Sequence, residues 1–186
     1  MTTADDDTTM TRRRFVGMMT AAVVAPTLLL PRRSLAESER PRQLSFYHTH
    51  TDEKLSLVYF ADGTYVRDSL LELDHFLRDH RTGDAEKIDP ALFDVLHTVG
   101  ALTGSRGIFE VISGYRSPAT NDMLRSAGGG VAKKSLHMQG KAIDVRLTDV
   151  ETSELRARAM ELARGGVGYY QRSNFIHLDT GRVRSW

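Results

Sequence analysis

The sequence contains no cysteine among its 186 residues. Disulfide bonds, thiolate nucleophiles, thiolate-ligated metals and a lipid-modified cysteine are therefore excluded. Any metal site must be built from the side chains of His, Asp or Glu. The missing cysteine does not decide the compartment in which the protein works.

The chain also lacks a strong excess of charge, since its formal net charge is +1. The first 36 residues hold five Arg and three Asp, which leaves the rest of the chain at −1. Such a chain offers no strongly basic surface, so we expect neither nucleic acid nor an anionic membrane as a partner. With 40% hydrophobic and 26% charged residues, the composition is that of a globular domain.

Long hydrophobic runs are scarce, and the main one lies near the amino terminus. It follows Thr11-Arg12-Arg13-Arg14-Phe15-Val16, runs to Leu30 and is interrupted by Pro26. A basic region, a short apolar region and the small residues of Ser34-Leu35-Ala36 are typical of a secretory signal. The paired Arg followed by x-Phe resembles the twin-arginine signal, which exports proteins that are already folded.

These features predict three segments. Residues 1–36 form a twin-arginine-type signal peptide that is cleaved, residues 37–43 a flexible lead-in, and residues 44–186 one domain. The expected location is the periplasm, and no membrane span remains after cleavage. The alternative for the first segment is a retained membrane anchor.

Hydrophobic spacing and turn residues predict an α+β fold, because the helices come first and the strands cluster late. We expect a small antiparallel sheet with helices packed on one side. Asp89 and Ser117, each followed by Pro, predict two helix starts. The expected helices cover residues 66–80, 90–102, 117–125 and 152–164, and the expected strands cover 44–47, 56–60, 109–113, 142–147, 165–170 and 175–179.

Two motifs carry residues that bind metals. The first is Ser135-Leu136-His137-Met138-Gln139-Gly140-Lys141-Ala142-Ile143-Asp144. If residues 142–147 form a strand with the odd-numbered positions in the core, Asp144 points away from the core, toward His137 on the preceding loop. In the second, Phe175-Ile176-His177-Leu178-Asp179, the same alternation places His177 and Asp179 on one face.

Two His and one Asp on adjacent strands can supply three ligands to a tetrahedral Zn²⁺ and leave the fourth position open for water. For either motif alone, a structural histidine is the alternative. A third motif, Ser113-Gly114-Tyr115-Arg116-Ser117, places Arg116 where a strand passes into a helix. Its guanidinium can bind a substrate carboxylate with two hydrogen bonds, or form an ordinary surface ion pair.

The three motifs in this order resemble those of the D-alanyl-D-alanine metallopeptidase superfamily, which shares its fold with Hedgehog signalling domains and LAS-type peptidoglycan peptidases. The closer similarity is to YcbK-like murein endopeptidases, over nearly all of residues 44–186. The resemblance implies a Hedgehog/DD-peptidase-like fold. It also implies His137, Asp144 and His177 as zinc ligands and Arg116 as the group that holds a substrate carboxylate.

The implied activity is that of an exported zinc metallopeptidase that acts on peptidoglycan in cell-wall remodelling. It would hydrolyse stem peptides or cross-links, with meso-diaminopimelate cross-links as the favoured target. Two alternatives are a zinc-containing peptidoglycan-binding domain without turnover and a DD- or LD-carboxypeptidase.

The sequence departs from the superfamily at one place. Many members carry an acidic residue or His shortly before the last ligand as general base, and this chain has Arg172 and Asn174 there. Asp179 can serve as the base instead, or it can orient His177. Trp186 is expected to pack the tail against the core.

Overall fold

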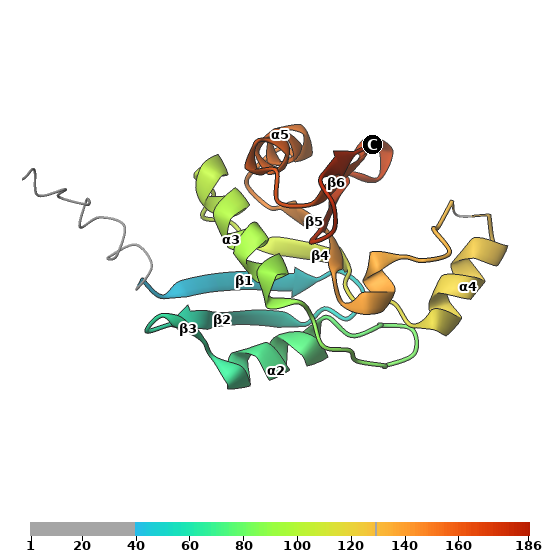
Figure 1. Ribbon diagram of the computed structural model, residues 1–186, viewed down its shortest axis with the longest axis horizontal. Coiled ribbons are helices and arrows are strands. Elements are labelled where there is room, and N and C mark those ends of the chain that lie inside the picture. The colour runs from blue at the N-terminus through green and yellow to red at the C-terminus, as the bar shows by residue number, and fades with distance from the viewer. Residues whose placement is uncertain (1–39, 129) are drawn as a thin grey trace, which may run out of the picture. The chain divides into compact units, whose positions relative to one another are not determined.

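A computed structural model describes residues 40–128 and 130–186 (Figure 1). The predicted signal peptide, residues 1–36, and the first part of the predicted lead-in lie outside these residues. Within the described part of the chain, no helix has the length and apolar character needed to cross a membrane.

The centre of the domain is a mixed sheet of eight strands in the order β3-β2-β1-β4-β5-β7-β6-β8. Most neighbours are antiparallel, but β1 with β4 and β6 with β8 are parallel. The α+β class is thus confirmed, and the sheet includes two parallel pairings that the sequence pattern did not predict. The strands are β1 Arg42–His48, β2 Lys54–Ala61, β3 Thr64–Tyr65, β4 Phe109–Ser113, β5 Ala142–Leu147, β6 Gly166–Tyr170, β7 Phe175–Asp179 and β8 Arg184–Ser185.

The helices are α2 Arg67–Phe76, α3 Pro90–Thr103, α4 Pro118–Ser126 and α5 Thr152–Leu162. Both predicted caps are present, since the side chains of Asp89 and Ser117 accept hydrogen bonds from the first-turn backbone amides of α3 and α4. Helix α2 ends four residues before the predicted residue 80. The reason is a tertiary contact. The Asp79 carboxylate accepts hydrogen bonds from the backbone N–H groups of Arg81 and Ser117, and this holds residue 79 outside the helix.

The two faces of the sheet have different chemistry. On one face Phe46 lies 5.8 Å from Phe76 of α2, and Tyr59 lies 5.9 Å from Phe93 of α3, as measured between ring centroids. Leu155 of α5 is buried in the same core. The helical layer therefore covers this face, as predicted, while α4 lies beyond the end of the sheet (Figure 1). The opposite face carries the polar residues of β5 and β7, because alternate side chains point to opposite faces.

His48 lies on the apolar face and is only 1% exposed. Its ring meets Phe76 edge-on at 5.9 Å, and its Nδ1 accepts the backbone N–H of His50. Burial, followed by the nearby His80 and His50, lowers the pKa of His48 to about 4. His48 is thus a neutral core residue, because its burial among apolar groups disfavours the charged imidazolium.

This position predicts a pH dependence of stability. The pKa of His48 is lower in the folded than in the unfolded protein. The contribution of neutral His48 to the free energy of unfolding is therefore complete above pH ~6.5 and is lost as the pH falls toward 4. In His48→Leu, the free energy of unfolding should fall less steeply over this range, by up to ~1.4 kcal/mol per pH unit. Urea unfolding between pH 4 and 7 measures the slope. His75→Leu, on the exposed side of α2, controls for the loss of a histidine, and parallel curves for His48→Leu and the wild type would contradict the prediction.

Candidate metal centre

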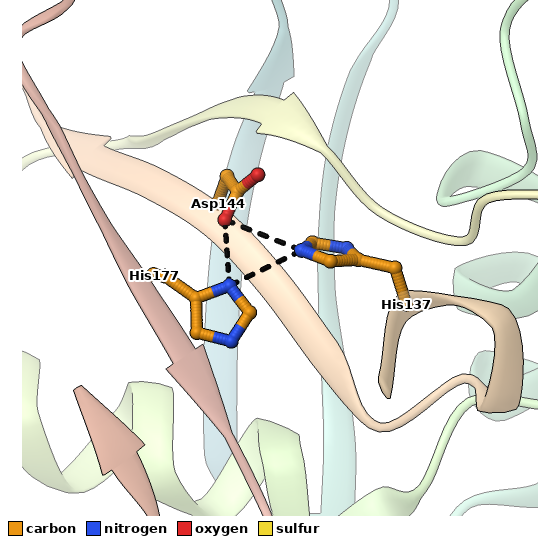
Figure 2. A group of neighbouring side chains, drawn as sticks. All are labelled: His137, Asp144 and His177. Atoms are coloured by element: carbon orange, nitrogen blue, oxygen red, sulfur yellow. Dashed lines mark hydrogen bonds and ion pairs between the residues drawn. The ribbon is translucent and has the colours of Figure 1, made fainter. Parts of the chain in front are cut away.

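Three elements bring His137, Asp144 and His177 to one point on the polar face of the sheet. Strands β5 and β7 pair antiparallel with Asp144 directly opposite His177. His137 comes from a 3-10 turn, Leu136–Gln139, just before β5. Figure 2 shows the three side chains pointing toward one another. Gly140 ends the turn with φ 63°, and a Cβ atom there would lie 2.1 Å from the backbone carbonyl oxygen of Lys87, so no other residue fits without rearrangement.

The facing atoms are spaced like the ligands of one metal ion. His177 Nδ1 lies 2.9 Å from Asp144 Oδ1, His137 Nε2 lies 3.2 Å from His177 Nδ1, and His137 Nε2 lies 3.3 Å from Asp144 Oδ1. All three residues are buried. Tetrahedral zinc with ligand bonds of ~2.0–2.1 Å requires ligand atoms roughly 3.3 Å apart. The group therefore has the size of a zinc site.

The outer hydrogen bonds of the two histidines decide which ring nitrogens are free. His137 Nδ1 lies 2.7 Å from the carbonyl oxygen of Gly114, and His177 Nε2 lies 3.0 Å from Asp179 Oδ2. Both oxygens accept hydrogen bonds, so in the neutral histidines these outer nitrogens carry the hydrogens. Two imidazole lone pairs and a carboxylate oxygen then face one another. A cation between them removes this repulsion, so the donor set fits a metal ion.

Asp144 uses its two oxygens differently. Oδ1 faces both histidines, whereas Oδ2 lies 3.9 Å from Arg116 Nη2. Burial opposes ionisation of Asp144, but the two histidines outweigh it and lower its pKa below the usual range. The backbone N–H of Arg116 donates to the carbonyl oxygen of His137, which ties the arginine to the metal-binding turn. Arg116 Nε has no hydrogen-bond partner within the described part of the chain.

Asp179 lies behind His177 and is fully enclosed. Its side chain is 0% exposed and accepts five hydrogen bonds: one from His177, one each from the backbone amides of Gly166 and Gly181, and two from the Arg184 guanidinium. Burial opposes ionisation, but these donors lower the pKa of Asp179. The carboxylate is therefore an anion whose acceptor positions are occupied.

A cleft of about 600 Å³ opens over the three residues. Asp144 carries the one side-chain carboxylate among the described residues that line it. Two residues stand where many superfamily members carry the general base. Arg172 is exposed, and Asn174 accepts a hydrogen bond from Thr152 beside a different pocket. The lining also includes three cationic and three aromatic side chains: Arg116, Lys134, Arg184, Tyr170, Phe175 and Trp186.

The structure brings together His137, Asp144 and His177 and places Arg116 beside them and Asp179 behind them. Sequence reasoning missed two contributors. One is the carbonyl group of Gly114, which holds His137, and the other is Arg184, which holds Asp179. No spacing pattern identifies them, because a backbone carbonyl has no sequence signal and Arg184 lies on the two-residue strand β8.

Comparisons with known proteins are consistent with this geometry. The model of a family described as peptidoglycan L,D-endopeptidase MepK matches residues 36–186. MepK of Escherichia coli strain K12 is 41% identical over 175 residues, which cover 94% of this chain and 96% of that protein. A probable MepK of Haemophilus influenzae is 43% identical over 161 residues, covering 85% and 87%.

Among solved structures, the L-Ala D-Glu endopeptidase ChiX of Serratia marcescens aligns with a TM-score of 0.36 and 22% identity, over 49% of this chain and 80% of that one. The family match and the two relatives cover most of the chain. The chain therefore belongs to the peptidoglycan L,D-endopeptidase MepK family and is a peptidase.

Proposed function

We propose that this protein is an exported zinc metallopeptidase that hydrolyses peptide bonds of peptidoglycan during cell-wall remodelling. Its favoured target is the cross-link between meso-diaminopimelate residues. The observation that carries the proposal is the convergence of two imidazole lone pairs and a carboxylate oxygen, 2.9 to 3.3 Å apart, at the base of the cleft. The names of the relatives, peptidoglycan L,D-endopeptidases, support the substrate class.

In this proposal His137, Asp144 and His177 hold the metal. When bound there, zinc supplies Lewis-acid polarisation of a carbonyl group and lowers the pKa of a water molecule. Arg116 takes a carboxylate of the wall peptide, because it is the cation that lines the cleft beside Asp144. Asp179 orients His177 through the Nε2–H group, since its own acceptor positions are filled and it does not line the cleft.

Export completes the proposal. Peptidoglycan lies outside the cytoplasmic membrane, so we assign residues 1–36 to a cleaved twin-arginine signal and residues 44–186 to the peptidase domain in the periplasm. We place the end of the leader at Ala36, because the small residues of Ser34-Leu35-Ala36 are typical of a signal cleavage site. A folded state before export would let the site acquire its metal in the cytoplasm.

The first test is the loss of a ligand. His137→Ala should lose bound zinc and should stop the release of new muropeptides from purified sacculi, because both depend on the same ligand. Elemental analysis measures the metal, and mass analysis of the digest measures the products. His50→Ala, an exposed histidine outside the site, is the matched control and should keep both properties.

The products distinguish the candidate activities. New fragments from cross-linked dimers indicate an endopeptidase, and loss of a single terminal residue indicates a carboxypeptidase. Binding to sacculi without fragments indicates a binding domain. Full hydrolysis by zinc-free His137→Ala would refute the proposed site.

The second test concerns Asp179. Asp179→Asn removes the charge that holds His177 and Arg184, so zinc affinity should fall ~10- to 100-fold, with turnover restored by excess zinc. Competition with a zinc chelator measures the affinity, and digestion at saturating zinc measures turnover. If zinc affinity is kept while turnover is lost, Asp179 acts as the general base and the orienting role is wrong.

The third test concerns Arg116. Arg116→Ala should raise KM for cross-linked muropeptides ~10- to 100-fold at unchanged zinc content, the range expected for one lost charge-assisted contact. Amidation of the substrate carboxylates should raise the KM of the wild type similarly and should have little further effect on Arg116→Ala. Arg172→Ala removes an exposed cation outside the cleft and is the control. Additive effects of mutation and amidation would show that Arg116 does not bind this carboxylate.

A further inference from the structure

Trp186 lies at the cleft, a position that packing of the tail does not explain. Its indole ring lies 5.2 Å from the ring of His177, between ring centroids, and borders the cleft above the metal centre. Trp186 is 49% exposed as a whole residue, so packing of the tail does not enclose it. Trp186 is also the single tryptophan of the sequence.

The indole is held in a defined orientation. Its Nε1–H donates to Tyr170 Oη at 3.2 Å, and the Arg184 guanidinium lies 4.9 Å from the ring centroid. The backbone N–H of Trp186 donates to the carbonyl oxygen of Val167, and its carbonyl oxygen accepts the backbone N–H of Tyr169, both in β6. Gly168 opposes His177 in the sheet, and a Cβ atom there would lie 2.7 Å from the indole. The chain thus requires a glycine at this point for the ring to lie against the metal-site face.

The rest of the cleft shows what such a ring can contact. Phe175 and Tyr170 stack with ring centroids 4.6 Å apart and line the cleft together with Trp186. Arg116 lies in the same cleft beside Asp144. An aromatic wall and a partly buried cation together suit a ligand that has an aliphatic stem and a carboxylate.

We propose that Trp186 is a specificity-determining residue whose exposed indole face packs against the aliphatic stem of the wall-peptide residue that Arg116 holds by its carboxylate. This inference rests on the proposed function and extends it to the substrate side chain. Tyr170 and Arg184 hold the ring in position, so the contact forms without much loss of side-chain freedom.

The test uses the zinc-loaded mature chain and cross-linked muropeptide dimers. Trp186→Ala should raise KM about tenfold with kcat within about twofold of the wild type, because the contact is made equally in the bound substrate and in the transition state. Trp186→Phe keeps an aromatic wall and should stay within about threefold of the wild-type KM. Val183→Ala, which truncates an exposed side chain of the same tail outside this cleft, is the matched control and should not change KM.

A role confined to tail packing predicts another pattern. Trp186→Ala would then lower the unfolding temperature or the zinc content and leave KM unchanged, and that result would overturn the proposal. The single tryptophan supplies a second readout that needs no hydrolysis. Adding an uncross-linked muropeptide to the wild type should change Trp186 fluorescence saturably, while the disaccharide without peptide should not.

The two measurements separate the failure of this inference from failure of the proposed function. If the wild type releases no fragments from sacculi but its fluorescence still responds to the muropeptide, the proposed hydrolysis fails and the contact at Trp186 stands. If hydrolysis occurs, but the muropeptide does not change the fluorescence of the wild type and Trp186→Ala keeps the wild-type KM, the contact is refuted.

Discussion

Two hydrogen bonds made outside the metal centre determine what its histidines can do. The carbonyl group of Gly114 and the carboxylate of Asp179 accept the outer N–H groups of His137 and His177, so in the neutral histidines the inner nitrogens present lone pairs to Asp144. Positive charge stabilises three electron-rich atoms at such short range in a buried site. Burial opposes protonation of His177, but its hydrogen bonds to Asp144 and Asp179 outweigh burial and raise its pKa, so a proton can supply this charge when no metal ion is bound. The geometry is thus prepared for a cation before any ion binds.

The sheet makes this arrangement possible because it separates two kinds of chemistry. Its apolar face is covered by α2, α3 and α5, and its polar face carries Asp144 and His177 of the candidate metal centre. Since β5 and β7 are inner strands with hydrogen-bonded neighbours on both sides, Asp144 and His177 stand on a rigid support. The residue that completes the site, His137, comes from a turn held by Gly140 and by the backbone of Arg116. A precise site on inner strands is less free to distort than one built on loops alone.

Residues 184–186 contact both the candidate metal centre and the aromatic side chains that line the cleft. Arg184 forms two hydrogen bonds with Asp179, which orients His177, and its guanidinium also lies over the ring of Trp186. Replacing Arg184 therefore removes contacts that hold both His177, through Asp179, and the indole of Trp186. The carboxylate that sequence reasoning offered as a base is held by this arginine and lies away from the cleft. The short strand β8 is thus part of the site, although it adds only two residues to the sheet.

The sequence by itself determined which His and Asp side chains could hold a metal, their alternation on two strands and the caps at Asp89 and Ser117, because these depend on local periodicity and local hydrogen bonds. It also pointed to Arg116. Only the tertiary structure decided the early end of α2, the parallel pairings, the enclosure of Asp179 and the exposure of Trp186 at the cleft. Each of these depends on partners distant in the chain or on backbone groups, and side-chain spacing along a sequence carries no signal for such contacts.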